Sequence, residues 1–364
     1  MKKKLTVAIL FGGKSAEHEI SLISARNIVD AMDKNKYEVV AIGIDKQGRW
    51  HLDESAKLLL GKSATKVEYR DAKNAAAIMP GASATPLLRP GGAGLGALGS
   101  IDVVFPILHG PFGEDGTVQG LLKLANLPFV GASVLGSAVG MDKDVMKRLL
   151  RDANIPIGNF LAFNRSDKIS FAKVSKTLGM PLFVKPANLG SSVGISKVSK
   201  PAQFAAAIKE AFRYDNKIVI EQFIKGREIE CSVLGNDEPM ASLPGEIVVN
   251  RDFYSYDAKY LDTQGSRLEI PAKLPKAIIK KVRDIALRAY KALSCEGMGR
   301  IDFFVQANGR VLVNEINTIP GFTKISMYPK MWEASGISYS KLIDRLIQLA
   351  IQRHRAEKRL RTSR

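Results

Sequence analysis

The segment RIDFFVQANGRVLVNEIN (300–317) places two acidic residues where they can share a metal ion. Its Asn308-Gly309 pair is a strong signal for a two-residue type I′ turn, and both flanks are rich in apolar, aromatic and β-branched residues. Such a turn predicts a β-hairpin in which Asp302 lies opposite Glu315. Like charges that face each other across paired strands are destabilising, so we expect a cation between them.

The same register sets Arg300 opposite Asn317, and side-chain alternation turns all four residues toward one face of the sheet. Two carboxylates and an amide oxygen are hard ligands that suit Mg²⁺, which often shares its coordination shell with substrate phosphates. We therefore predict that Asp302, Glu315 and Asn317 bind magnesium. The alternative is a solvated hairpin whose acids pair with nearby lysine or arginine.

A magnesium ion of this kind implies phosphate, and KPANLGSSVG (185–194) is suited to bind it. Lys185 ends a predicted strand, and a loop of glycines and serines follows before the next strand. Glycines let the backbone approach a ligand closely, and N–H groups with hydroxyls can surround oxyanions. A plain glycine-rich turn, with Lys185 and Lys143 as solvated surface lysines, is the alternative.

Two further acids, Glu221 and Glu228, flank the segment EQFIKGRE. Acids at these positions can hold the amino group of an adenine and the hydroxyls of a ribose. Most acids at strand ends are exposed, so solvated side chains are the competing interpretation.

Two loops follow strands of a predicted open α/β sheet. HGPFGEDG (109–116) comes after IDVVFPIL (101–108), and GGKSAEHEIS (12–21) comes after the first strand. Ligands of open α/β sheets bind at the carboxyl ends of the strands, which makes both loops and Glu17 candidates for ligand binding. A glycine turn and ordinary helix capping are the alternatives.

The elements that must position these residues divide the chain into three units. In the first unit (1–140), strand and helix alternate, which predicts an open parallel α/β domain. We expect strands at 5–11, 38–45 and 101–108 and helices at 18–32 and 116–126. The stretch 61–100 is rich in Ala, Gly and Pro and is expected to be an irregular surface insertion.

The second unit (141–225) is expected to be a central domain, and the third (226–364) a C-terminal domain with a mixed sheet, so that the chain is α/β with an α+β arrangement overall. The second unit has predicted helices at 141–154 and 201–213 and strands at 181–185, 193–198 and 217–224. The third has predicted strands at 227–234 and 240–249, the hairpin, and helices at 274–294 and 338–353. The polar, tyrosine-rich stretch 250–266 is predicted to be a mobile loop.

The composition excludes several classes of protein. The 364 residues are 46% hydrophobic, which is enough for a sizeable core. The only cysteines are Cys231 and Cys295, which fits a reducing cytoplasm and gives no sign of zinc or of a disulfide framework. The apolar run in MKKKLTVAILFGG is too short for a signal peptide, and no stretch is long enough to span a membrane.

The chain carries 54 Lys and Arg against 36 Asp and Glu, a formal net charge of +18. Such a charge favours contact with polyanions, including nucleotides, nucleic acids and anionic membranes. Because the basic residues are scattered and no nucleic-acid motif accompanies them, we interpret the charge as a solvated surface plus a basic tail at 353–364.

Together these segments resemble the ATP-grasp superfamily, and specifically the D-alanine–D-alanine ligase family. The segments that carry the resemblance, in the family's order, are FGGKSAEHEIS, HGPFGEDG, MDKDVMKRLL, FVKPANLGSSVGISKV, IEQFIKGREIE, YDAKY, GMGRID and NEINTIPGFT. They cover essentially the whole chain. The resemblance implies an ATP-grasp fold in which ATP lies between the central and C-terminal domains.

The resemblance also implies which residues bind ATP. Lysines would contact the phosphates, the 190–194 loop would close over them, and Lys259 would reach the γ-phosphate when the 250–266 loop shuts. Glu221 would face the adenine and Glu228 the ribose. The implied nucleotide site comprises Lys143, Lys185, Gly190, Ser191, Ser192, Glu221, Gln222, Phe223, Ile224, Glu228 and Lys259. The implied ligands of two Mg²⁺ ions, with Mn²⁺ as an alternative, are Asp302, Glu315 and Asn317.

For the first amino acid, the resemblance implies that Glu17 binds the ammonium group near His109. Tyr260, Ser191 and Glu17 would form a hydrogen-bonded triad that joins the closing loop to the site.

For the second amino acid, the resemblance implies that Arg300 and the backbone N–H of Gly321 hold the developing oxyanion. Ser326 would help to bind the carboxylate of the second D-alanine.

The implied reaction is the ATP-dependent ligation of two D-alanine molecules through an acylphosphate, which supplies peptidoglycan synthesis. It implies a cytoplasmic enzyme, and a homodimer through the N-terminal domain is usual for the family. We expect neither a membrane nor a nucleic-acid partner. The family does not explain the high positive charge.

Three alternatives remain. A depsipeptide ligase would use D-lactate as its second substrate, and because the residue at Tyr260 often differs in that group, tyrosine favours the dipeptide. Another ATP-grasp carboxylate–amine ligase is disfavoured by HGPFGEDG and YDAKY. A nucleic-acid-binding protein would bind DNA or RNA in a salt-sensitive way and hydrolyse ATP regardless of D-alanine.

Overall fold

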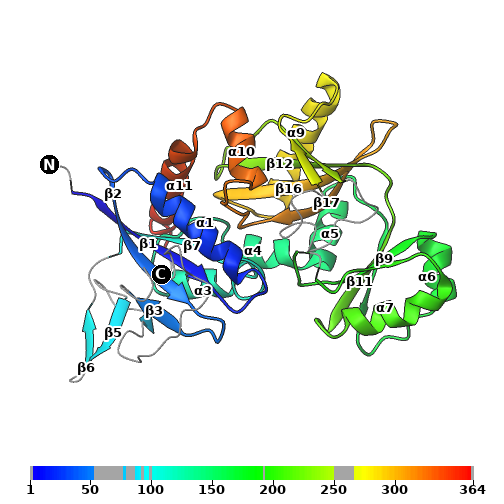
Figure 1. Cartoon of the computed structure of the whole chain (residues 1–364), viewed down its shortest axis with the longest axis horizontal. Coiled ribbons are helices and arrows are strands. Elements are labelled where there is room, and N and C mark those ends of the chain that lie inside the picture. The colour runs from blue at the N-terminus through cyan, green and yellow to red at the C-terminus, as the bar shows by residue number, and fades with distance from the viewer. Residues whose placement is uncertain are drawn as a thin grey trace.

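The computed structural model describes residues 3–52, 77–78, 87–91, 94–97, 101–191, 193–249 and 266–361. The described chain forms three larger sheets and one small sheet. Figure 1 shows the first sheet, in blue, at one end of the molecule and the green sheet of the middle segment at the other end, with the yellow and orange sheet of the last segment between them.

The first sheet is parallel at its centre and is covered on both faces. Its order is β3-β2-β1-β7, with β1 parallel to β2 and to β7 and with β3 antiparallel at the edge. These elements and two covering helices are β1 (Leu5–Gly12), β2 (Tyr37–Ile44), β3 (Trp50–Leu52), β7 (Val103–Ile107), α1 (His18–Ala31) and α3 (Thr117–Leu124). In β1, Ile9 packs into the core that contains α1, and Leu10 packs into the core that contains α3. This burial on both faces explains the unbroken apolar run of the first strand.

The end of the chain returns to this first sheet. Two helices, α10 (Met327–Ala334) and α11 (Tyr339–Glu357), contribute Trp332 and Leu346 to the core that holds β1 and α1. Buried Arg353 of α11 donates hydrogen bonds to the carbonyl oxygens of residues 131 and 129, at 2.6 and 2.8 Å. The N-terminal sheet and the last helices therefore share one core.

The middle segment forms an antiparallel sheet of order β10-β9-β11-β8. Its elements are β8 (Phe160–Asn164), β9 (Leu182–Pro186), β10 (Ser196–Val198), β11 (Lys217–Gln222), α6 (Phe171–Leu178) and α7 (Phe204–Ala211). Val184 and Ile220 pack against the two helices. Alternation therefore turns Lys185 and Glu221 to the opposite face of the sheet.

The last segment forms the sheet β15-β14-β12-β16-β17, with β13 paired to β12. Its elements are β12 (Arg227–Leu234), β13 (Met240–Ala241), β14 (Gly245–Val249), β15 (Ser266–Glu269), β16 (Met298–Val305), β17 (Val311–Asn317) and α9 (Lys276–Ala292). Cys231 and Ile301 pack into the core under α9, together with α5 (Lys143–Asp152). Their neighbours Glu230 and Asp302 alternate to the other face.

The predicted hairpin is present, but the predicted two-residue type I′ turn is wrong. Gln306 donates to the carbonyl of Arg310, and Gly309 adopts a left-handed φ of 78°, so the loop has three residues, 307–309. A β-bulge between Asp302 and Phe303 in the ladder, where β17 has one extra residue, offsets the longer loop. The two departures cancel, and the predicted pairs of the site are retained.

Other expectations were wrong in detail. The insertion at 61–100 is not wholly irregular, because its described parts pair as the antiparallel strands β4 (Ala77–Ile78), β5 (Leu87–Gly91) and β6 (Gly94–Ala97). The single strand expected at 240–249 is two strands, since Pro244 stands between them and lacks the N–H that a ladder needs. The elements β3, β8, β15, α6, α10 and α4 (Val134–Met141) were not predicted.

In the part of the chain that the structure describes, no helix is both long enough and apolar enough to cross a bilayer.

Candidate active site

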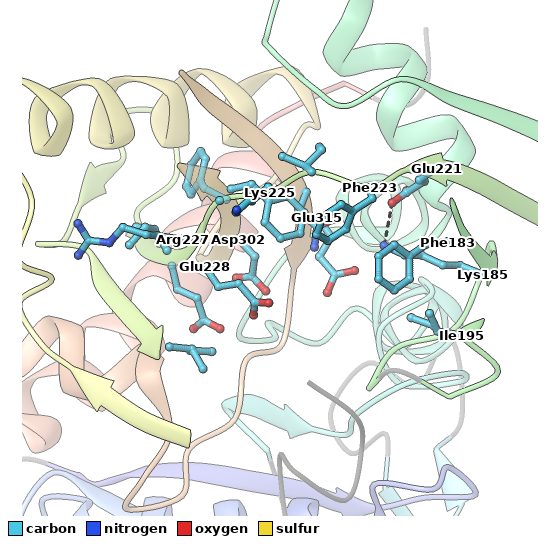
Figure 2. A pocket seen from close by; sticks show the side chains of 18 of the residues that line it. Phe183, Lys185, Ile195, Glu221, Phe223, Lys225, Arg227, Glu228, Asp302 and Glu315 are labelled. Carbon is cyan, nitrogen blue, oxygen red and sulfur yellow. Dashed lines mark ion pairs between the residues drawn. The ribbon is translucent and has the colours of Figure 1, made fainter. Parts of the chain in front are cut away.

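A cavity of about 420 Å³ lies between the sheet of the middle segment and the last sheet. Figure 2 shows side chains from both sheets around it, with the carboxylates of Glu228, Asp302 and Glu315 turned toward the space and Lys185 paired with Glu221 at its side. Its volume is in the usual range for sites that bind small molecules. The cavity brings together most of the predicted nucleotide residues: Lys143, Lys185, Gly190, Ser191, Glu221, Gln222, Phe223, Ile224 and Glu228.

The carboxylates of the hairpin lie on the wall of this cavity. Asp302 is opposite Glu315 and Arg300 is opposite Asn317, as predicted. Arg300 donates from Nε and Nη2 to the two oxygens of Asp302, each at 2.7 Å, and Asn317 Nδ2 donates to Oδ2 of Asp302 at 3.1 Å. Lys143 Nζ lies 3.8 Å from Oε2 of Glu315. Basic side chains therefore neutralise both acids in this structure.

A second carboxylate faces Arg300 from the neighbouring strand. Glu230 of β12 is opposite Asp302 in the ladder, and its Oε2 lies 2.8 Å from Nε of Arg300. Burial lowers the pKa of Arg300, but Asp302 and Glu230 outweigh it and hold that pKa well above its ordinary value. The guanidinium is therefore permanently charged and held between two acids.

Three lysines converge on one buried acid and on the glycine-rich loop. Lys185 Nζ lies 2.8 Å from Oε2 of Glu221, and Lys147 Nζ lies 3.1 Å from Oε1 of the same residue. Lys143 donates to the carbonyl oxygen of Leu189 at 2.6 Å. Lys143 is the first residue of α5, whose N-terminus is capped by the side chain of Asp142.

The charges of this cluster follow from burial and pairing. Burial raises the pKa of Glu221, but Lys147 and Lys185 outweigh it and lower that pKa to about 2. Burial lowers the pKa of Lys143, whereas the pKa of Lys185 is raised because Glu221 outweighs burial. The cluster thus offers cationic groups to an anion that enters the cavity.

The loop after Lys185 approaches the N-terminal segment. Ser191 adopts a φ of 53° and Gly194 a φ of 69°. A Cβ on Gly194 would lie 2.7 Å from the ring of Tyr214, so this position needs glycine. A Cβ on Gly190 would lie 3.8 Å from Oε2 of Glu17, which brings the carboxylate of Glu17 next to this loop.

One end of the cavity has an apolar wall. The rings of Phe183 and Phe223 lie 6.2 Å apart, and Nζ of Lys197 lies 5.1 Å from the centre of the Phe223 ring. Ile195 faces the same space in Figure 2. These rings suit a flat group of a ligand, and Lys185 lies beside them, with its Nζ 6.0 Å from the centre of the Phe183 ring.

The loop after β7 meets the segment after β17 beside the cavity. His109 donates from Nδ1 to the carbonyl oxygen of Ile319 at 3.0 Å, and its Nε2 is buried without a hydrogen-bond partner. Burial lowers the pKa of His109, so the ring is neutral. A Cβ on Gly110 would lie 3.5 Å from Oε2 of Glu17, which places Glu17 between this loop and the glycine-rich loop.

The predicted second-substrate residues are neighbours at the start of α10. Ser326 Oγ accepts a hydrogen bond from the N–H of Thr323 at 2.9 Å. A Cβ on Gly321 would lie 2.8 Å from that same Oγ, so Gly321 and Ser326 are in contact. The hydroxyl of Ser326 and the unobstructed backbone of Gly321 therefore lie next to each other.

Sequence reasoning missed three groups of this site: Glu114, Lys147 and Glu230. Lys147 follows Lys143 by four residues, one helical turn, and this spacing was an available signal. Glu230 follows Glu228 by two residues in a strand, which sets both on one face. Glu114 accepts a hydrogen bond from the N–H of Ile319, beside His109; it lies within HGPFGEDG and had no separate signal.

Three predicted residues, Ser192, Lys259 and Tyr260, lie outside the described residues. Within the described part of the chain, no group of three or more His, Cys, Asp or Glu side chains is arranged to hold a metal ion. The two hairpin acids therefore form a pair that an amide, water or phosphate would have to complete.

Comparison with known proteins agrees with this geometry. Residues 6–132 match the family model described as the D-ala D-ala ligase N-terminus, and residues 149–348 match the D-ala D-ala ligase C-terminus. The chain is 54% identical over 363 residues to a D-alanine–D-alanine ligase of Shouchella clausii, covering 99% of this chain and 98% of the relative. It is 53% identical over 364 residues to D-alanine–D-alanine ligase A of Escherichia coli K12, covering 99% and 100%.

Solved structures show the same fold. A D-alanine–D-alanine ligase from Coxiella burnetii superposes with a TM-score of 0.84 at 42% identity, covering 98% of this chain and 96% of that one. A D-Ala:D-Ser ligase from Enterococcus faecalis superposes with a TM-score of 0.86 at 36% identity, covering 96% and 100%. A D-alanine–D-alanine ligase from Bacillus anthracis complexed with ATP has a TM-score of 0.71 at 29% identity, covering 97% and 99%.

Proposed function

This chain belongs to the D-alanine–D-alanine ligase family, with its ATP-grasp fold, and we propose that it joins two D-alanine molecules into the dipeptide used for peptidoglycan. The observation that carries the proposal is the cavity between the two sheets, where lysines, a glycine-rich loop and paired carboxylates converge. A triphosphate needs cationic groups and backbone donors of this kind. ATP would lie with its adenine at the apolar end and its phosphates among the lysines.

The first step activates a carboxylate. A carboxylate oxygen of the first D-alanine attacks the γ-phosphorus of ATP, the bond to the β-phosphate oxygen breaks, and ADP leaves. Lys143 and Lys185 disperse the charge of the transferring phosphoryl group. Glu17 holds the ammonium group of this D-alanine, and neutral His109 lies close to the same position.

The second step forms the peptide bond. The amine of the second D-alanine, having lost a proton, attacks the acyl carbon. Phosphate then leaves with the electrons of the broken carbon–oxygen bond and takes up the second proton, which the nitrogen releases as the amide forms. Arg300 and the N–H of Gly321 hold the oxyanion of the tetrahedral intermediate, and such donors typically contribute about 3–4 kcal/mol each. Ser326, in contact with Gly321, binds the carboxylate of the second D-alanine.

The donor set of the hairpin fits magnesium. Asp302 and Glu315 are opposite each other on the cavity wall, and Asn317 contacts Asp302. Hard oxygen donors beside a phosphate site are typical of Mg²⁺, and Mn²⁺ accepts the same ligands. Two bound ions would neutralise phosphate charge together with Lys143 and Lys185.

Lys259 and Tyr260 complete the proposed site by resemblance to the family. Lys259 would contact the γ-phosphate, and Tyr260 would join Ser191 and Glu17. Because an acylphosphate hydrolyses readily, a loop that excludes water from it has a direct chemical use.

A test of the function is release of phosphate from ATP with different second substrates. We expect D-alanine to stimulate release and L-alanine not to do so. D-serine and D-lactate belong in the same assay, since one structural relative is a D-Ala:D-Ser ligase. ATP hydrolysis that ignores D-alanine would refute the proposal.

Two further proposals rest on the family alone. A homodimer formed through the N-terminal segment is the expected assembly, and light scattering of the purified chain tests it. A cytoplasmic location is expected because ATP and D-alanine are used together, and cell fractionation tests it.

A further inference from the structure

Arg300 lies between two carboxylates that belong to different strands. Asp302, two residues along on β16, accepts from both Nε and Nη2 at 2.7 Å. Glu230, on β12, has its Oε2 2.8 Å from Nε and is only 5% exposed. The ladder fixes this arrangement, because Glu230 is opposite Asp302 and Ser232 is opposite Arg300.

This inference rests on the proposed function, in which Asp302 is a metal ligand and Glu230 is not. Asp302 serves as a magnesium ligand there, yet both of its oxygens contact Arg300 in this structure. A divalent cation on Asp302 repels a guanidinium on the same carboxylate. Arg300 nevertheless has to stay in place for the oxyanion.

Glu230 is an alternative hydrogen-bond acceptor for Nε of Arg300. Nε carries a single hydrogen, which points to Asp302, so the Glu230 oxygen at 2.8 Å is paired with Arg300 by charge. A small rotation of the guanidinium turns that hydrogen toward Glu230 without moving the side chain away. Glu230 can therefore accept the hydrogen bond of Arg300 Nε when Asp302 binds a cation instead.

We propose that Glu230 is a positioning residue that retains Arg300 when Asp302 binds a divalent cation. Without Glu230, Arg300 has Asp302 as its nearest counter-ion and competes with the cation for it. Glu230 thereby sets the affinity of the metal site, although it is not itself a ligand. A residue with a merely structural role would change stability and leave metal affinity unchanged.

The test measures binding of Mn²⁺ to the full chain in the presence of ADP, by the electron paramagnetic resonance signal of free Mn²⁺. Glu230→Gln keeps the shape and removes the charge, and we expect the dissociation constant of Mn²⁺ to rise by roughly tenfold, the size of one lost charge contact. ADP affinity without metal should stay the same. Unchanged Mn²⁺ affinity in the folded variant would overturn the proposal.

Asp45→Asn is the matched control. Asp45 is fully buried and paired with an arginine, Arg49 Nε at 2.8 Å, but it follows β2 in the N-terminal sheet. Its loss should lower the melting temperature without changing the Mn²⁺ dissociation constant. An equal rise in both variants would show that lost stability, and not the position of Arg300, weakens metal binding.

A double-mutant cycle shows whether Glu230 acts through Arg300. In an Arg300→Gln background, Glu230→Gln should leave Mn²⁺ affinity within about twofold, because no guanidinium remains to compete. A full tenfold loss in that background would contradict the proposal. Glu230→Asp retains the charge and serves if Glu230→Gln does not fold, with an intermediate rise expected.

The proposed function is tested separately in the unsubstituted chain. Absence of phosphate release in response to D-alanine would refute the ligase proposal, whereas normal release with unchanged Mn²⁺ affinity in Glu230→Gln would refute only the role of Glu230.

Discussion

Glu114 accepts a hydrogen bond from the backbone N–H of Ile319, with 3.1 Å between Oε1 and N. Its other oxygen accepts from the N–H of Gly110 at 2.7 Å. His109, from the same loop, donates to the carbonyl oxygen of Ile319 at 3.0 Å. Glu114 and His109 therefore bind the N–H and the C=O of Ile319, which lies two positions before Gly321.

This arrangement predicts a pH dependence of stability. Burial and the nearby Glu17 raise the pKa of Glu114 to about 8 from an ordinary value of 4.5. Between these values the folded chain binds a proton that the unfolded chain has lost, so the free energy of unfolding falls as the pH rises from about 4.5 to about 8. The loss is complete above about pH 8.

Glu114→Gln should remove this part of the dependence. Melting temperatures of the parent and the variant are measured from pH 5 to pH 9. That of the parent should fall relative to that of the variant by a few degrees as the pH rises, since roughly 1 kcal/mol moves the melting temperature of a chain of this size by about 2 °C. Parallel curves over the whole range would show that Glu114 does not titrate in this way.

Arg300→Ala should reduce both turnover and stability. Loss of an oxyanion donor lowers kcat by about 10²–10³-fold. Buried Glu230 and partly buried Asp302 would lose their guanidinium, which costs about 3–5 kcal/mol. Turnover is measured with saturating D-alanine and stability by urea unfolding. Arg300→Lys is the control, because it keeps the charge but cannot donate to two oxygens of Asp302 at once; a fully active Arg300→Lys would contradict the need for this geometry.

Lys147 and Lys185 provide a matched pair, since both contact Glu221 but only Lys185 lines the cavity. Lys185→Met should weaken ADP binding by about tenfold or more, because a phosphate contact is lost. Lys147→Met should leave ADP binding within about threefold and should destabilise the fold by about 1–3 kcal/mol, since a buried carboxylate loses a partner. Calorimetry with ADP and thermal melts separate the two. Equal losses of ADP affinity would mean that Lys147 also reaches the nucleotide.

Lys259→Ala should lower turnover far more than it weakens ADP binding. Its proposed contact is with the γ-phosphate, which ADP lacks, so the substitution removes stabilisation only when ATP reacts. Steady-state kcat and the ADP dissociation constant are the two measurements. Comparable losses in both would argue against a contact with the γ-phosphate.

Local patterns in the sequence predict a strand or helix well where its pattern of buried residues follows its own geometry. The apolar run of β1 and the alternation in β16 are both readable, because each strand must cover or border a core. The pairing of β12 with β16 joins residues about 70 positions apart, and no local pattern specifies it. Glu230 acquires its partner Arg300 only through that pairing, which is why the sequence did not single it out.

The hairpin shows how a correct prediction can rest on a wrong detail. The Asn308-Gly309 signal is real, yet Gly309 serves as the left-handed third residue of a longer loop. The bulge in β17 restores the register, because the buried face of the sheet requires Phe303 and Val313 to point inward. Burial along the strands, rather than the turn, therefore determines that Asp302 faces Glu315.

Deleting Ala307 tests this conclusion. The shortened chain would connect Gln306 and Arg310 by Asn-Gly alone, a favoured two-residue loop, and the strand pairs from Val305 and Val311 onward need not change. We expect D-alanine-dependent phosphate release within about twofold of the parent and a stability change below about 1 kcal/mol. Deleting Val311 from β17 is the control, since a one-residue slip turns the site residues to the wrong face and should abolish activity. If the Ala307 deletion were as damaging as the Val311 deletion, the loop rather than the buried strands would set the register of the two carboxylates.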